Sequence, residues 1–184
     1  MVDLVATGAF GTSLPVTVGA LTLSEWPIGE AHLIAPFRDR SDAVTQALAP
    51  YGLRFPAPGE SLTAEGGARI DWAGRGRALY SGPLPDLAGL AAVTEAASGL
   101  AACRLGGPGA ELALNHLVPI DLSPEAFPEG RTARTLLGHM SVSLSREGPE
   151  AFGLLAMRSM AGTLVHELTR AMRQLSARPP FGLS

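Results

Sequence analysis

The sequence predicts a single α+β domain in which an antiparallel sheet packs against helices on one side. Two segments, residues 68–72 and 139–146, alternate apolar and polar residues with the period of a β-strand. A third segment, residues 159–175, repeats apolar residues at helical spacing. Strand and helix patterns also follow one another in the same order twice, although the two halves share no residue pattern. We therefore expect two strand–helix–strand–strand–helix halves in one compact unit.

The chain divides into an amino-terminal arm at residues 1–30, a first α+β half at 31–93 and a second at 94–178. The arm lacks a helical period, and its glycines and Pro15 argue against a membrane-spanning helix. Asp3 stands where a signal peptide carries positive charge. We expect the arm to be extended and, because it is apolar, to lie against another surface.

The first half is expected to begin with a buried strand and a helix. Ser41 is the predicted N-cap of that helix, and Gly52 is the predicted stop. Alternation and turn residues then predict a hairpin with its turn at residues 74–76. The expected order is strand 31–37, helix 41–52, loop 55–67, strand 68–72, strand 78–81 and helix 84–93.

In the second half, residues 139–146 are the clearest strand, because Met140, Val142 and Leu144 oppose three serines. Residues 152–157 are apolar on both faces, which is typical of a central strand. Ser159 is the predicted N-cap of a final helix that ends before Pro179. The earlier elements are expected to be strand 100–105, turn 106–109, helix 111–118, a short turn at 123–125 and strand 131–137.

Composition excludes several classes of function. The 184 residues contain 14 basic side chains, all of them arginine, and no lysine. Schiff-base catalysis and a phosphate-binding P-loop lysine are therefore excluded. A net charge of −3 argues against a nucleic-acid-binding surface.

The residues that most often carry chemistry are scattered. Cys103 lies in an apolar run and is expected to be a buried core thiol. The four histidines, at positions 32, 116, 139 and 166, form no metal-binding spacing. His139 is the least ordinary of them because it opens the polar face of an alternating strand.

Two glycine-rich segments are interpreted as tight turns instead of phosphate loops. Residues 74–77 precede a strand, and Pro108 removes one amide from the turn at 106–109. Arg158 stands at a strand–helix junction, where we expect it to pair with a buried carboxylate such as Asp121 or with a partner's backbone. The aromatic residues are too dispersed to predict a stacked cofactor.

A series of short motifs follows in order from residue 93. It resembles the gamma subunit of heterotetrameric sarcosine oxidase over about half of the chain, and the amino-terminal half only in outline. The motifs are Val93-Thr94-Glu95, Leu105-Gly106-Gly107-Pro108, Leu117-Val118-Pro119-Ile120-Asp121-Leu122, Phe127-Pro128-Glu129-Gly130, Ala133-Arg134-Thr135, Leu137-Gly138-His139-Met140, Arg146 and Arg158-Ser159-Met160-Ala161.

This resemblance implies the folate-binding fold of glycine-cleavage aminomethyltransferase and a non-catalytic structural subunit. It implies a complex that oxidatively demethylates sarcosine to glycine, in which this chain packs directly on the alpha subunit beside beta and delta subunits. We expect a cytoplasmic location, because the single cysteine cannot form an internal disulfide and Asp3 argues against a signal peptide. FAD, FMN, NAD, tetrahydrofolate and zinc are expected in the other subunits. No catalytic, cofactor-binding or metal-binding residue is expected in this chain, and neither nucleic acid nor a membrane is an expected partner.

Two alternatives remain open. The chain could be a stand-alone folate-binding protein of the same fold, in which Glu95 reads the pterin edge and Arg158 binds the glutamate tail. It could also be a homo-oligomeric module from another pathway, since a shared fold alone does not fix function.

Overall fold

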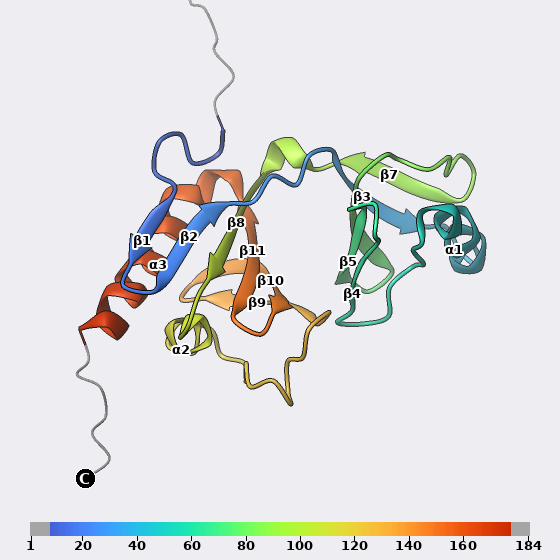
Figure 1. Cartoon of the computed structure of the whole chain (residues 1–184). Coiled ribbons are helices and arrows are strands. Elements are labelled where there is room, and N and C mark those ends of the chain that lie inside the picture. Colours follow the sequence, from blue (N-terminus) through green and yellow to red (C-terminus); the bar gives the residue numbers. More distant parts are fainter. Residues whose placement is uncertain (1–7, 178–184) are drawn as a thin grey trace, which may run out of the picture.

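The computed structural model describes residues 8–177 of the chain. The strands within this range form two antiparallel sheets (Figure 1). The larger sheet has the strand order β1-β2-β8-β11-β10-β9, and the smaller sheet has the order β4-β5-β6-β3-β7. The strands are β1 (Val16–Val18), β2 (Leu21–Glu25), β3 (Ala31–Pro36), β4 (Ser61–Thr63), β5 (Arg69–Gly74), β6 (Arg77–Ser81), β7 (Ala91–Glu95), β8 (Leu100–Gly106), β9 (Thr132–Leu137), β10 (Met140–Gly148) and β11 (Ala151–Met157).

Within residues 8–177, three α-helices and three 3₁₀ turns accompany the sheets. Among residues 8–177 no helix has the length and apolar character needed to cross a membrane. The helices are α1 (Ser41–Leu48), α2 (Ala110–Leu114) and α3 (Ala161–Ser176), and the 3₁₀ turns are η1 (Ala49–Tyr51), η2 (Ala97–Gly99) and η3 (Arg158–Met160).

Each sheet buries one face against its own helices. The larger sheet packs alternate residues, such as Cys103 and Leu154, against α2 and against Leu164 and Leu168 of α3. The smaller sheet packs Ile34 and its neighbours against α1 in a separate core. Among residues 8–177 no helix covers the opposite face of either sheet, and these two uncovered faces turn toward each other.

Two crossing segments carry the chain between the sheets. Residues 26–30 lead from β2 to β3, and residues 96–99 lead from β7 to β8 (Figure 1). A backbone junction adds to them, in which the amide of Ser61 donates to the carbonyl of Gly130 at 2.8 Å and the amide of Thr132 donates to that of Gly59 at 2.9 Å.

The α+β class is confirmed, but there are two sheets where the sequence predicted one. The helix expected at residues 84–93 is wrong: this segment is irregular up to Leu90 and then forms β7, which pairs with β3. Pro85 and Gly89 interrupt the proposed helix, and the apolar residues after them complete a sheet edge instead. The predicted loop at 55–67 contains the short strand β4.

Within the segment expected to be an extended arm, residues 16–25 form a β-hairpin whose second strand pairs with β8. The hairpin turn packs closely on the turn at 106–109. Gly107 has φ of +113°, and a Cβ built on it would lie 2.1 Å from the carbonyl oxygen of Ala20. The tight turn predicted there is thus also a contact point at which only glycine fits.

Helix starts differ from the sequence prediction. Neither Ser41 nor Ser159 caps a helix, because the N-cap positions are Arg40 and Met160 and no side-chain cap hydrogen bond is formed. Helix α3 instead begins through the 3₁₀ turn η3, whose backbone hydrogen bonds satisfy part of the helix start. The helix predicted at 111–118 is shorter, since α2 covers only Ala110–Leu114.

Both strongly patterned strands of the second half are confirmed. Met140, Val142 and Leu144 of β10 are buried as predicted. Strand β11 is buried on both faces, because Phe152 and Leu154 pack in the core of the larger sheet and Leu155 faces the smaller sheet.

A buried arginine fixes the long connection between α2 and β9. Arg146 of β10 is 2% exposed, and its guanidinium donates to the backbone carbonyls of Leu122, Phe127 and Pro149. Its Nη2 also lies 3.0 Å from Oε2 of Glu111 on α2. One side chain thus replaces the regular hydrogen bonding that this connection lacks.

We expect Arg146→Met to destabilise the chain by at least about 2 kcal/mol, because it leaves several buried carbonyls without a donor. Denaturant unfolding of the purified chain measures the loss. Arg170→Met is the matched control, since Arg170 is 55% exposed and pairs with Glu167 on the helix surface. That control should change stability by less than about 0.5 kcal/mol, and equal losses in both variants would contradict the role given to Arg146.

Candidate functional site

An ion-pair network joins the two uncovered sheet faces. Nε of Arg69, on β5, donates to both carboxylate oxygens of Asp71 at 2.8 and 3.0 Å. Its Nη1 donates to Oε2 of Glu147, on β10, at 2.6 Å. Arg104 of β8 lies 3.5 Å from the same oxygen, and Ser145 donates to the other one at 2.7 Å. The Arg69 and Glu147 side chains are 7% and 11% exposed, so this pair is shielded from water.

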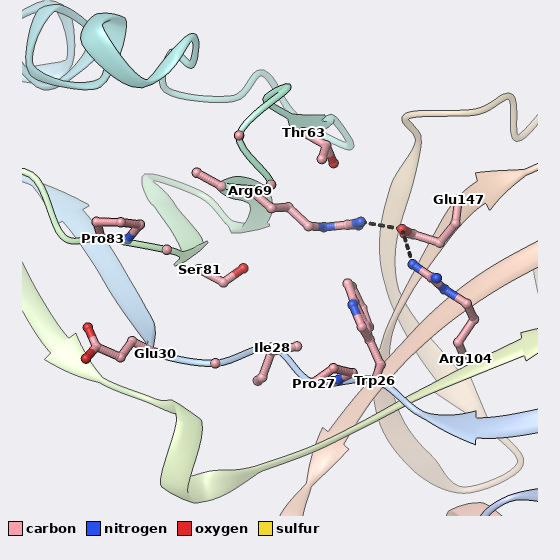
Figure 2. Close-up of a pocket in the computed structure, with 15 residues that line it drawn as sticks. Trp26, Pro27, Ile28, Glu30, Thr63, Arg69, Ser81, Pro83, Arg104 and Glu147 are labelled. Atoms are coloured by element: carbon pink, nitrogen blue, oxygen red, sulfur yellow. Dashed lines mark hydrogen bonds and ion pairs between the residues drawn. The ribbon is translucent and has the colours of Figure 1, made fainter.

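An indole ring stacks on the two arginines of this network. Trp26 follows β2 at the start of the first crossing segment, and Figure 2 shows it below the Arg69–Glu147 pair. The guanidinium carbons of Arg69 and Arg104 lie 4.7 and 5.8 Å from the centre of the Trp26 ring. The ring therefore makes cation–π contacts with both, and anchors the crossing segment to the network.

Mutual charge keeps the network ionised in spite of its burial. Burial opposes the charge of Arg69, but hydrogen bonds and charges from Asp71 and Glu147 outweigh that effect and raise the pKa of Arg69. Burial likewise opposes the charge of Glu147, whereas Arg69, Ser145 and Arg104 together lower the pKa of Glu147 below its ordinary value of 4.5. Each partner thus makes the charge of the other tolerable in a dry site.

We expect Glu147→Gln to destabilise the chain by about 1–3 kcal/mol at pH 7, because it removes the charged acceptor of a buried arginine. The pKa of Glu147 is lowered by folding, so its stabilising contribution is complete above about pH 4.5 and is lost as the pH falls through the folded value. The difference between wild type and variant should therefore shrink in acid. Urea unfolding at several pH values measures it, with the surface variant Glu167→Gln as the control.

Strand β11 makes room for the network by carrying a glycine. A Cβ built on Gly153 would lie 2.7 Å from Cζ3 of Trp26, 2.9 Å from Oγ of Ser145 and 3.2 Å from Oε1 of Glu147. The backbone of Gly153 needs no left-handed conformation. The glycine is therefore required by the space that the indole and the carboxylate occupy.

Alanine is a better strand residue than glycine, so a Gly→Ala substitution in a strand with room for the added Cβ should stabilise the chain. Here we expect the opposite, a loss of about 1–3 kcal/mol with displacement of Trp26. Thermal unfolding together with the Trp26 fluorescence spectrum checks both effects in a Trp72→Phe background. Gly66→Ala is the control, because nothing lies within 4 Å of a Cβ built there.

Two cavities lie beside the network. The first, of about 650 Å³, is lined by the network and by the first crossing segment (Figure 2). Its walls also include Glu30, Thr63, Ser81 and Pro83. The second, of about 410 Å³, lies between the uncovered faces. Its lining is mainly apolar and comes from both sheets, and the charged residues in it are Asp71 and Arg134.

These residues are arranged to hold two sheets together. The four charged side chains of the network are paired with one another, and Arg104 is the most exposed of them at 46%. Within the described chain, no three His, Cys, Asp or Glu residues are grouped so that they could hold a metal ion.

The four histidines lie on different elements. His32 is on β3 with a buried Nδ1 that has no hydrogen-bond partner among the described residues. His139 lies in the exposed β9–β10 turn and not on the polar face of the strand, because β10 begins at Met140. His116 follows α2, and His166 is on α3.

Cys103 is fully buried as predicted, and burial raises the pKa of its thiol to about 12. Glu95 ends β7 and accepts hydrogen bonds from the backbone amide and the hydroxyl of Ser98. Arg158 lies in η3, and Asp121 is exposed, not buried as the sequence predicted. The carboxylate of Asp121 accepts a hydrogen bond from the amide of Ser123 at 2.8 Å. The folate-reading pair Glu95–Arg158 and the Arg158–Asp121 pair both stay predictions.

The central residues of the site were not singled out from the sequence. Alternation in residues 68–72 does place Arg69 and Asp71 on one strand face, which is a usable signal for their pairing. Glu147 is 78 residues away from Arg69, and no local pattern links them. Trp26 was also assigned no role.

No model of a known protein family matches the sequence. Two curated proteins do resemble it, both named sarcosine oxidase subunit gamma. The protein from Corynebacterium sp. strain P-1 is 34% identical over 76 residues, and that from strain U-96 is 36% identical over 74 residues. These alignments cover 41% and 40% of this chain, and little more than a third of each relative, 37% and 36%.

A likeness in structure extends over nearly the whole chain. One chain of heterotetrameric sarcosine oxidase from Corynebacterium sp. U-96, solved in complex with pyrrole 2-carboxylate, matches with a TM-score of 0.77 and 25% identity. The match covers 93% of both chains, so it includes both sheets. The resemblance to the gamma subunit that the sequence predicted is confirmed.

Proposed function

We propose that this chain is the small, non-catalytic gamma subunit of a heterotetrameric sarcosine oxidase, and that it stabilises the assembly that oxidatively demethylates sarcosine to glycine. The observation that carries the proposal is the match along 93% of a chain from such a tetramer. Local sequence identity of 34–36% to two gamma subunits supports it independently.

The arrangement of charges in the site favours a structural role. Arg69 is held between two carboxylates through Nε and Nη1, while its buried Nη2 has no hydrogen-bond partner among the described residues. Glu147 is held between two arginines and a serine. Groups held in this way fix the angle between two sheets. They are poorly suited to exchanging protons with a substrate, because each is committed to its ionised form.

The finer parts of the proposal concern the rest of the complex. We propose that this chain contacts the alpha subunit directly, with beta and delta subunits in the same cytoplasmic assembly. FAD, FMN, NAD, tetrahydrofolate and zinc would be held by those other subunits. We also propose that the two sheets are a version of the aminomethyltransferase-like folate-binding fold.

Co-expression tests the assembly. A tagged form of this chain, produced together with the alpha, beta and delta subunits of a heterotetrameric sarcosine oxidase, should retain them through purification at physiological salt. The complex should be yellow and oxidise sarcosine, whereas this chain alone should be colourless and inactive. Failure to retain the other subunits, or flavin or turnover in the isolated chain, would contradict the proposal.

Calorimetry with reduced folate separates the main alternative. The isolated chain should show no saturable heat at micromolar concentrations, since the proposal leaves tetrahydrofolate to another subunit. Saturable binding would favour a stand-alone folate-binding protein.

A further inference from the structure

The uncovered face of the larger sheet changes character along its strands. Cross-strand pairing defines three successive rows of residues on this face. The first row is polar, the second is mixed, and the third ends in large apolar side chains. The rows are Thr132, Ser145, Gly153 and Arg104; then Arg134, Ser143, Leu155 and Ala102; then Leu136, Ser141, Met157 and Leu100.

The smaller sheet covers these rows unequally. Beside the first row, Arg69 reaches across to Glu147. At the second row, Nη1 of Arg134 donates to the carbonyl of Ala73 on β5 at 3.1 Å. At the third row no such hydrogen bond between the sheets is seen among the described residues, and Met157 and Leu136 are 66% and 44% exposed.

Exposure of Met157 is unusual for its position. It ends β11, a strand that is otherwise buried on both faces in the middle of the sheet. It also lines the cavity of about 410 Å³, so the mouth of that cavity opens at the third row. Leu33 and Leu79 from the smaller sheet and Leu100 and Leu155 from the larger one form the apolar walls behind it.

We infer that this mouth is where the large alpha subunit docks, by inserting an apolar side chain between the sheets and placing a carboxylate beside Arg134. The inference rests on the proposed function. An apolar pocket with a polar rim is a common form of an interface hot spot. The thioether of Met157 adapts easily to an incoming side chain, and exposed apolar surface of this kind is expected to be covered.

Charge selects the chemistry of the incoming segment. Arg134 is exposed, and its bond to the Ala73 carbonyl orients the guanidinium at the rim. Asp71 lies inside the cavity but is already paired with Arg69. An acidic residue next to the apolar anchor therefore finds a cation, whereas a basic residue there would face Arg134 and be repelled.

Thiol labelling tests the inference without background, because the native Cys103 is fully buried and burial raises the pKa of its thiol to about 12. Met157→Cys places a reactive thiol at the mouth. Leu112→Cys is the matched control, since Leu112 is 55% exposed on α2, on the helix-covered side of the same sheet. Both variants are labelled with a maleimide, alone and in the purified four-subunit complex.

In the complex, labelling of the Met157→Cys variant should slow at least tenfold, whereas labelling of Leu112→Cys should not change. Equal labelling of Met157→Cys in both states would overturn the inference while leaving the assembly itself intact. If labelling of the isolated Met157→Cys chain becomes slower as the chain is concentrated, the surface is covered by a second copy. That result would also overturn the inference. If wild-type chain forms no complex, the proposed function fails, and the docking inference fails with it.

Co-purification adds a second measurement. Met157→Glu should reduce recovery of the alpha subunit at least tenfold, because it brings a charge into the apolar contact, whereas Leu112→Glu should not. An unchanged melting temperature of the isolated Met157→Glu chain shows that the variant is folded, so that loss of the alpha subunit does not result from unfolding. Full recovery of alpha by a folded Met157→Glu chain would contradict docking at this mouth.

Discussion

The buried Arg69–Glu147 pair is the constraint on which the arrangement of the two sheets depends. Each sheet has its own apolar core, so neither core fixes the angle between them. Arg69 is held in place by Asp71 on its own strand and reaches a carboxylate on the other sheet, beside the backbone junction formed by Ser61 and Thr132. Breaking one partner would leave a charge in a dry site, which makes the geometry all-or-none and not adjustable.

Several neighbouring features follow from this pair. Trp26 stacks on Arg69 and brings the first crossing segment with it, and Gly153 leaves the space that the indole needs. Because the sheets are joined closely at this end, the faces diverge along the strands and leave a cavity behind Leu33 and Leu155. The same interaction therefore accounts for the joined end and for the open end.

Local patterns predicted much of the fold. The alternation at β10, the doubly apolar β11 and the long apolar stripe of α3 depend on each segment's own periodicity, and the structure confirms all three. The failures came where tertiary contacts decide. Residues 84–93 are rich in Ala and Leu, yet the last part of the segment forms β7, because it pairs with the open edge of β3.

The site was less predictable, because its members are far apart in the sequence. Arg69 and Asp71 could be paired from strand periodicity, but Glu147 and Trp26 join them only through the sheet topology. Arg146 shows the same limit, since the sequence marked it only as the end of a strand. The motifs after residue 93 are therefore enough to show a resemblance, whereas the residues of the site come together only in the folded chain.

The connectivity also bears on how the chain acquires its fold during synthesis. Strands β3 to β7 are continuous in sequence, so the smaller sheet can assemble as soon as residue 95 has left the ribosome. The β1–β2 hairpin is made first, but its pairing strand β8 arrives only some 75 residues later, and β11 later still. The smaller sheet is in effect an insertion that brings distant strands together, which shortens the loop that must close and lowers the entropic barrier to completing the larger sheet.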